Sequence, residues 1–241
     1  MSKIPKDPNE IFEEIISDYR ALFSDDLVSI IVYGSAASGD YRPGKSDINL
    51  MIVLSDEEIE HIDKAFKTIA KWNKSKVAVP LFLTEQYIET STDVFPIEYL
   101  NFQRNHFLVY GKDVLTDLIF DRGDVRLQCE REIKGKLLIL REAYLETEGK
   151  GKALKNVLDH SLQAFVAIFT ALLFLREREI PLENRDIVAA TSEAFQLDSD
   201  LLNKLLDVKE EKSKLNDTEM KTLFRNYLKE VRKLSKMVDE L

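Results

Sequence analysis

Apolar and polar residues alternate in blocks along the first half of the chain, and these blocks predict helices and strands in turn. Two blocks place apolar residues at helical spacing, and three shorter runs are strand-like. The predicted elements are a helix over 8–23, strands over 27–33 and 48–54, a helix over 56–73 and a strand over 76–83. Strands that alternate with helices are typical of an α/β or α+β unit.

Two of the predicted strands have features that indicate their place in a sheet. The run 48–54 is apolar at nearly every position, as expected for a strand that is covered on both faces. Pro80 interrupts the run 76–83, and proline has no N–H for a central ladder. We therefore expect that run to form an edge strand or to contain a bulge.

The pattern changes near residue 121, after which no strand is predicted. The remaining blocks predict helices over 124–148, 152–179, 183–196, 198–212 and 216–240. Five helices with short connections are typical of a bundle. We expect two domains, one of residues 1–120 and a helical bundle of residues 121–241.

The charge of the chain is −9 and is spread unevenly. Residues 1–120 contain 12 Lys and Arg against 20 Asp and Glu, whereas the two signs nearly balance in the rest. General nucleic-acid binding depends on basic surfaces, so the acidic first half argues against it. A small anionic ligand held by a few local donors remains compatible with this charge.

Compartment and membrane contact can be judged from a few short features. The single Cys129 excludes an internal disulfide framework and fits a reducing cytoplasm. The start of the chain has no apolar core and is not a signal peptide. The apolar run 164–175 is shorter than the ~20 residues of a membrane span. We expect a cytoplasmic protein without a membrane partner, in which this run is a buried helix.

The loop between the first two predicted strands, in YGSAASGDYRPGKSDINL, contains the candidate chemistry. Gly34 permits a tight turn at the end of the first strand. The amides that follow, together with the Ser35 hydroxyl, can then point at an anion, and a helix beginning there would add its positive dipole end. This part of the loop therefore predicts a phosphate cradle.

Asp47 and Asn49 stand at the start of the second strand. They are two residues apart in an extended chain, so their side chains share one face. Two oxygen ligands above a phosphate cradle can hold Mg²⁺, which in turn can bridge to nucleotide phosphates.

The pattern Gly-Ser, eleven residues, then Asp-Ile-Asn-Leu resembles the signature of the nucleotidyltransferase superfamily, the DNA polymerase β-like enzymes. The local sequence is most similar to that of the antibiotic (aminoglycoside) adenylyltransferases and their bacterial relatives. The resemblance is specific over residues 30–54 and looser to about residue 118, and HFLVYGKDVL (106–115) is similar to a segment near the end of this domain. It implies an α+β fold, with a mixed β-sheet flanked by helices and a C-terminal all-α helical bundle as accessory domain.

The resemblance also implies an activity and residue roles. Members of the family transfer a nucleoside monophosphate from an NTP to a hydroxyl and release pyrophosphate, usually with two divalent metal ions. Gly34 and Ser35 would contact the nucleotide phosphates. Asp47 would be the first metal ligand, and Asn49 stands at the position of the second. The acceptor would be a small molecule or a protein, and the accessory domain makes a homodimer an expectation.

The sequence departs from the family pattern at two places. Asn49 replaces an acid, and an amide oxygen brings no negative charge to a metal. The third acid that many members place on the next core strand is missing from residues 77–83. Glu98 is the substitute that we favour, because it precedes a helical segment. The alternatives are a catalytically degenerate module that binds a nucleotide or a protein, and an enzyme that modifies a partner protein in a toxin–antitoxin-like pair.

Three polar residues of the loop have both a functional and an ordinary interpretation. Arg42 and Lys45 precede Asp47 and could contact the triphosphate, but solvated loop charges are as good an explanation. Ser46 could bind the nucleotide or cap the turn that leads into the strand.

Overall fold

The computed structural model describes residues 4–241 and divides into two compact units. The first, called here the sheet unit, comprises Met1–Asp93 and Tyr99–Ile119. The second, called the helical unit, comprises Val94–Glu98 and Phe120–Leu241. The segment Val94–Glu98, which lies between the two parts of the sheet unit in the sequence, is therefore assigned to the helical unit.

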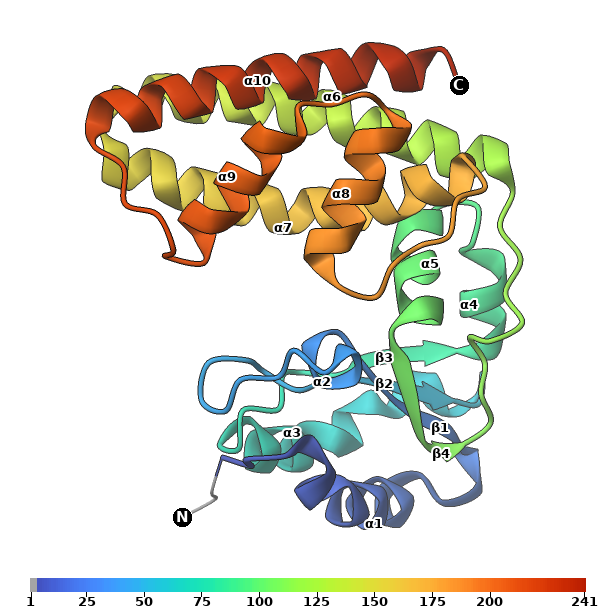
Figure 1. The fold of residues 1–241 in the computed structure, drawn as a ribbon. Helices are drawn as coiled ribbons and strands as arrows, with labels where there is room; N and C mark the ends of the chain where they lie inside the picture. The colour runs from blue at the N-terminus through green and yellow to red at the C-terminus, as the bar shows by residue number, and fades with distance from the viewer. Residues whose placement is uncertain (1–3) are drawn as a thin grey trace. The chain divides into compact units, whose positions relative to one another are not determined.

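The sheet unit contains a four-stranded mixed sheet in the order β3-β2-β1-β4 (Figure 1). Strand β1 runs antiparallel to β2 and β4, whereas β2 and β3 are parallel. The strands are β1 Leu27–Tyr33, β2 Asn49–Leu54, β3 Leu81–Thr84 and β4 His106–Gly111. Its helices are η1 Pro8–Ile11, α1 Phe12–Phe23, η2 Ser24–Asp26, α2 Ser35–Ser38, η3 Glu58–Ala65, α3 Phe66–Asn73 and α4 Glu85–Thr90. Helix α5, Pro96–Arg104, is divided between the two units after Glu98. The chain thus has the predicted α+β fold with a mixed sheet.

One face of the sheet packs against α1 and α3, which lie on the same side of it in Figure 1. The apolar face of α1 meets alternate residues of the two central strands, such as Ile30 and Ile52. Asp18 of α1 accepts hydrogen bonds from Trp72 Nε1 (2.9 Å) and Lys71 Nζ (2.6 Å) of α3. Strand alternation therefore buries one apolar face under two helices that are tied to each other.

The central strand β2 is buried on both faces, as its continuous apolar run predicts. Its residues Leu50 and Ile52 belong to the core under α1, and Met51 and Val53 are buried on the opposite face. The neighbouring β3 is an edge strand, which agrees with the interpretation of Pro80. It starts only after that proline, so it is shorter than the predicted run.

The predicted helix over 56–73 consists of two parts. Its first part, η3, is a 3-10 helix in which His61 has non-helical backbone angles, and only α3 is α-helical. The backbone kinks at that histidine, whose side chain is exposed. The kink lies within η3, so the predicted helix is not one continuous α-helix.

The carboxylate of Asp113 anchors the chain after β4. It accepts hydrogen bonds from His106 (3.0 Å), from the Thr116 hydroxyl (2.7 Å) and from the Leu115 N–H (3.0 Å). Burial works to raise its pKa, but these hydrogen bonds outweigh burial and lower the pKa to about 2.

We predict that Asp113→Asn lowers the free energy of unfolding of the sheet unit at pH 7 by about 1–2 kcal/mol. The depressed pKa stabilises the folded state above the ordinary aspartate pKa, and this contribution is lost as the pH falls toward 2. Wild type and variant should therefore converge in stability near pH 2. Unfolding followed by the fluorescence of Trp72, the single tryptophan, would measure this. Equal stability at pH 7 would contradict it.

The helical unit is a bundle of five helices whose bounds follow the predicted ones within a few residues. They are α6 Arg122–Glu146, α7 Gly151–Leu175, α8 Asn184–Ala194, α9 Ser199–Lys209 and α10 Asp217–Asp239. Helix α7 packs against each of the other four. Its Ser161 hydroxyl lies 2.7 Å from the hydroxyl of the buried Tyr227 of α10. The apolar stripe predicted within α7 is therefore the centre of this unit.

By length and apolar composition alone, α7 could also cross a membrane. Half of its most apolar window is buried among the other helices of the bundle. The core helix of a helical bundle passes the same test of length and composition.

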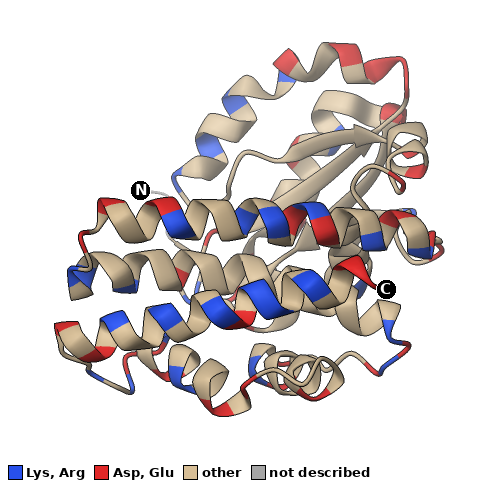
Figure 2. Cartoon of the chain, turned by 90° about the horizontal axis from the view of Figure 1, so that it is seen from above, with Lys and Arg blue, Asp and Glu red and all other residues tan. Residues whose placement is uncertain are grey.

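Basic residues recur along α10, the helix that leads to the C-terminus (Figure 2). The exposed members are Arg225, Lys229, Arg232, Lys233 and Lys236. The last four line an open hollow of about 520 Å³. This surface is one place where the basic residues of the second half of the chain gather.

Candidate functional site

The turn between β1 and α2 has a backbone that only glycine adopts easily. Gly34 has φ +72° and ψ −148°, a region that side chains resist. Its carbonyl accepts hydrogen bonds from the N–H groups of Ala37 (2.9 Å) and Ser38 (3.0 Å), which closes the short helix α2. The amides of Ser35 and Ala36 begin that helix, and first-turn amides have no carbonyl partner within a helix. These two amides are therefore the candidates for binding an anion.

Asn49 lies directly beside this turn. It begins β2 and pairs in register with Tyr33, the residue before Gly34. A Cβ at position 34 would lie 3.1 Å from Asn49 Nδ2, so the glycine leaves room for that side chain. The structure therefore brings together Gly34 and Asn49, which stand at opposite ends of the loop.

Asp47 faces a cation that the sequence pattern did not predict. Its side chain is 54% exposed, and its Oδ1 lies 3.4 Å from Lys76 Nζ. Lys76 reaches this position because the stretch before β3 runs parallel to the start of β2, where Ile48 pairs with Val77. The apolar run after Lys76 indicated a strand. That run did not reveal that Lys76 would lie beside Asp47.

The carboxylate of Asp47 influences the pKa of a nearby tyrosine, Tyr41. The pKa of the Tyr41 phenol is raised by its burial and by the carboxylates of Glu10 and Asp47. Its hydroxyl donates to the carbonyl of Pro5 (3.0 Å). Tyr41 is therefore tied to the segment before η1 and lies within electrostatic reach of Asp47.

The loop residues before Asp47 form a closed turn. The Arg42 N–H donates to the Ser46 hydroxyl (3.1 Å), and the Arg42 carbonyl accepts from the N–H groups of Lys45 (3.0 Å) and Ser46 (2.9 Å). Ser46 therefore holds the turn that leads to β2. The residues Arg42 and Lys45 are exposed. Their contact with a triphosphate stays a prediction.

Glu98 lies in the helical unit, near the start of α5. Its carboxylate accepts a hydrogen bond from Gln128 Nε2 of α6 (2.7 Å), and Gln128 Oε1 accepts one from the Ile97 N–H (2.7 Å). The buried Gln128 thus ties this end of α5 to α6. The sheet unit does not gather Glu98 with the other predicted site residues, and its role as third acid stays a prediction.

The oxygen donors of Asp47 and Asn49 fit one divalent ion better than two. Asp47 supplies the single carboxylate, Asn49 supplies an amide oxygen, and Lys76 already places a positive charge at Asp47. Within residues 4–241, no three carboxylate, imidazole or thiol groups gather as a metal cluster. A cation bound here would take its remaining ligands from the nucleotide, as Mg²⁺ commonly does.

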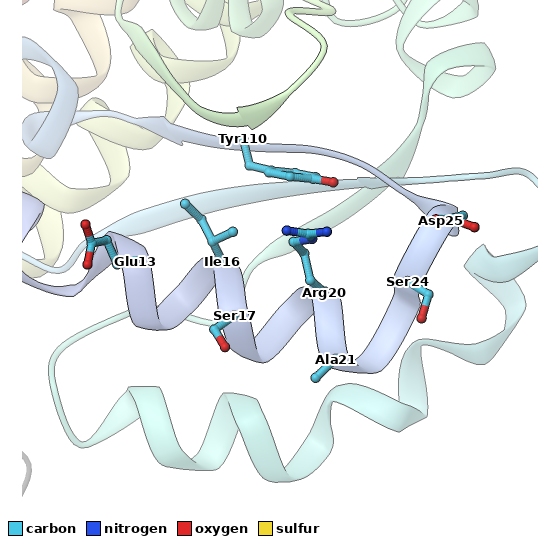
Figure 3. Close-up of a pocket in the computed structure, with 8 residues that line it drawn as sticks. All are labelled: Glu13, Ile16, Ser17, Arg20, Ala21, Ser24, Asp25 and Tyr110. Atoms are coloured by element: carbon cyan, nitrogen blue, oxygen red, sulfur yellow. The ribbon is translucent and has the colours of Figure 1, made fainter.

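An open hollow of about 610 Å³ lies elsewhere in the sheet unit (Figure 3). Residues of α1 and the following turn line it, together with Tyr110 of β4. The Arg20 guanidinium lies over the Tyr110 ring, 5.5 Å from its centre. Since the lining includes none of the predicted site residues, this hollow is separate from the loop between β1 and β2.

Comparisons with known proteins agree with this geometry. Residues 12–103 match the family described as nucleotidyltransferase domain, and the match includes the whole loop between β1 and β2. No curated protein matches the chain. Nine chains of solved structures match. One is spectinomycin adenyltransferase AAD(9) from Enterococcus faecialis, solved with ATP and spectinomycin.

That adenyltransferase shares the fold over nearly its full length. The TM-score is 0.55, with 14% identity, over 94% of this chain and 98% of the other. Identity at this level shows a common fold, and the family match locates the domain in the sequence. Residues 12–103 therefore match a nucleotidyltransferase domain, and the chain shares the fold of a solved adenyltransferase over most of its length.

Proposed function

We propose that the protein transfers a nucleoside monophosphate from an NTP to a hydroxyl group of a small-molecule acceptor. The domain of residues 1–120 would bind the nucleotide, and the bundle of residues 121–241 would be the accessory domain. The observation that carries the proposal is the Gly34 turn, which follows β1 directly and lies beside Asn49. The family match over residues 12–103 supports nucleotide transfer in general, and this turn is the location that we propose for it.

The reaction that we propose is an in-line displacement. The acceptor oxygen attacks the α-phosphorus, and the bond from that phosphorus to the bridging oxygen of the β-phosphate breaks. Pyrophosphate leaves with the bonding electrons, and the hydroxyl proton passes to a carboxylate, for which Glu98 is the candidate. The amides after Gly34 and the Ser35 hydroxyl hold phosphate oxygens, and donors fixed in advance stabilise the charge that develops.

Asp47 and Asn49 would hold Mg²⁺, which supplies positive charge for the triphosphate when it is bound. ATP is the first nucleotide to test, since AAD(9) was solved with it. The acceptor classes to test first are spectinomycin-like and aminoglycoside antibiotics. The net charge of −9 favours such cationic acceptors. Arg42 and Lys45 would steer the triphosphate toward the turn.

The test is pyrophosphate release from each NTP with a panel of these antibiotics, with mass spectrometry of the acceptor. Asp47→Ala should slow release at least about 100-fold, because it removes the only carboxylate of the metal site. Asp40→Ala is the matched control, since Asp40 is an exposed acid of the same loop, and it should retain activity. Equal rates for the two variants would contradict the role of Asp47.

Asn49 favours a second candidate function, that of a module which binds a nucleotide and catalyses no transfer. This module would bind NTP at the same turn and release no pyrophosphate with any acceptor. Asn49→Asp distinguishes the two functions, because a second carboxylate restores the acid pair. Transfer activity that appears only in this variant would favour the module.

A further inference from the structure

Lys76 is held beside Asp47 by the backbone on both sides of it. The Ile48 N–H donates to the Lys76 carbonyl (2.8 Å), and the Ala78 N–H donates to the Ile48 carbonyl (2.9 Å). This ladder starts the parallel pairing that continues between β2 and β3. The position of Lys76 next to Asp47 is therefore a consequence of the sheet topology.

The backbone of Lys76 is also unusual. Its φ is +65°, a left-handed conformation that few residues other than glycine adopt. The Lys76 N–H donates to the carbonyl of Asn73 (3.2 Å) at the end of α3, and this turn directs the chain into the strand. These backbone hydrogen bonds fix the position from which the Lys76 side chain extends.

The charges of Asp47, Asn49 and Lys76 balance without a metal ion. Asp47 contributes one negative charge, Asn49 contributes none, and Lys76 contributes one positive charge 3.4 Å from the Asp47 carboxylate. A site with two acids would instead need bound cations before it could accept a polyanion. An ammonium group binds phosphate oxygens directly, as a point charge.

We propose that Lys76 is a built-in cation of the nucleotide site. Its ammonium group, positioned by Asp47, binds a phosphate group of the NTP at the Gly34 turn. The protein therefore binds ATP without a divalent ion, and Mg²⁺ adds to this binding without being required for it. This inference rests on the proposed function, because it places the nucleotide at that turn.

The test is calorimetric titration of the full chain with ATP, once with EDTA and once with Mg²⁺. Lys76→Met keeps most of the aliphatic stem and removes the charge. Lys74→Met is the matched control, since Lys74 is an exposed lysine two residues earlier. Thermal unfolding of each variant, followed by Trp72 fluorescence, confirms that the sheet unit is folded.

Wild type and Lys74→Met should bind ATP in EDTA, and Lys76→Met should bind it about tenfold or more weakly, as expected for a lost charge-assisted hydrogen bond. Asn49→Asp should make binding depend more on Mg²⁺. If wild type binds ATP only with Mg²⁺, or if Lys76→Met binds like wild type in EDTA, the inference is overturned and the proposed function stands. If folded wild type binds no NTP under either condition, the proposed function fails, and the inference fails with it.

Discussion

Gly34→Ala should abolish most ATP binding while the sheet unit remains folded. The substituted residue would keep an angle pair that costs about 1–3 kcal/mol for a residue with a side chain. Its Cβ would also lie 3.1 Å from Asn49 Nδ2, so Asn49 or the turn has to shift. Because the phosphate-binding amides follow directly in the chain, we expect ATP affinity to fall at least about tenfold.

Gly39→Ala is the control for this result. Gly39 also has a positive φ, +85°, but a Cβ there meets nothing within 4 Å. It should show a similar loss of stability and nearly unchanged ATP affinity. Equal losses of affinity in the two variants would mean that general strain in the loop, and not the turn at Gly34, controls binding.

Gly111→Ala should have the largest effect on stability. A Cβ at this position, where φ is +81°, would lie 1.9 Å from the carbonyl oxygen of Val28, far inside any real contact. Gly111 pairs with Ser29, and the next residue, Lys112, donates its N–H to the same Val28 carbonyl (3.2 Å). The backbone of β4 must therefore move away from β1, so the substitution removes sheet pairing as well as adding strain.

We expect the sheet unit to lose about 3–5 kcal/mol, which corresponds to a melting temperature lower by roughly 15 °C. Trp72 is 4% exposed and lies in this unit, so its fluorescence follows this transition separately from the bundle. Gly44→Ala, with φ +76° and open space around it, should lower the melting temperature by only a few degrees. A Gly111→Ala protein that melts with the control would contradict the observed pairing of β1 with β4.

Local patterns predicted the elements that are long or strongly apolar. The strand over 27–33 was predicted with the bounds of β1, and the apolar run 48–54 contains β2. The helices of the bundle were also predicted, because their spacing is periodic over several turns. In these segments, local propensity and final packing favour the same structure.

Features that depend on pairing across the sheet were harder to predict. The strand predicted over 76–83 begins only at Leu81, since Pro80 cannot join the ladder and Lys76 has left-handed angles. The kink at His61 interrupts a pattern that looks like one helix. Neither feature changes the hydrophobic pattern, so that pattern could not reveal it.

Some residues of the candidate site could be predicted from local sequence, and one depends on pairing across the sheet. Gly34, Ser35, Asp47 and Asn49 were predicted because a turn and two strands place them in one stretch of sequence. Lys76 was missed, since only the parallel pairing of Ile48 with Val77 brings it to Asp47. Long-range pairing of this kind has no signal within a single sequence.

The measurement that tests the central claim most directly is ATP titration of wild type, Gly34→Ala and Gly39→Ala under identical conditions with Mg²⁺. The structure predicts that wild type and Gly39→Ala bind ATP, and that Gly34→Ala loses most of its affinity while its Trp72 fluorescence still reports a folded sheet unit. ATP binding of equal strength in all three proteins, or no binding of any NTP by folded wild type, would contradict a nucleotide site at the Gly34 turn.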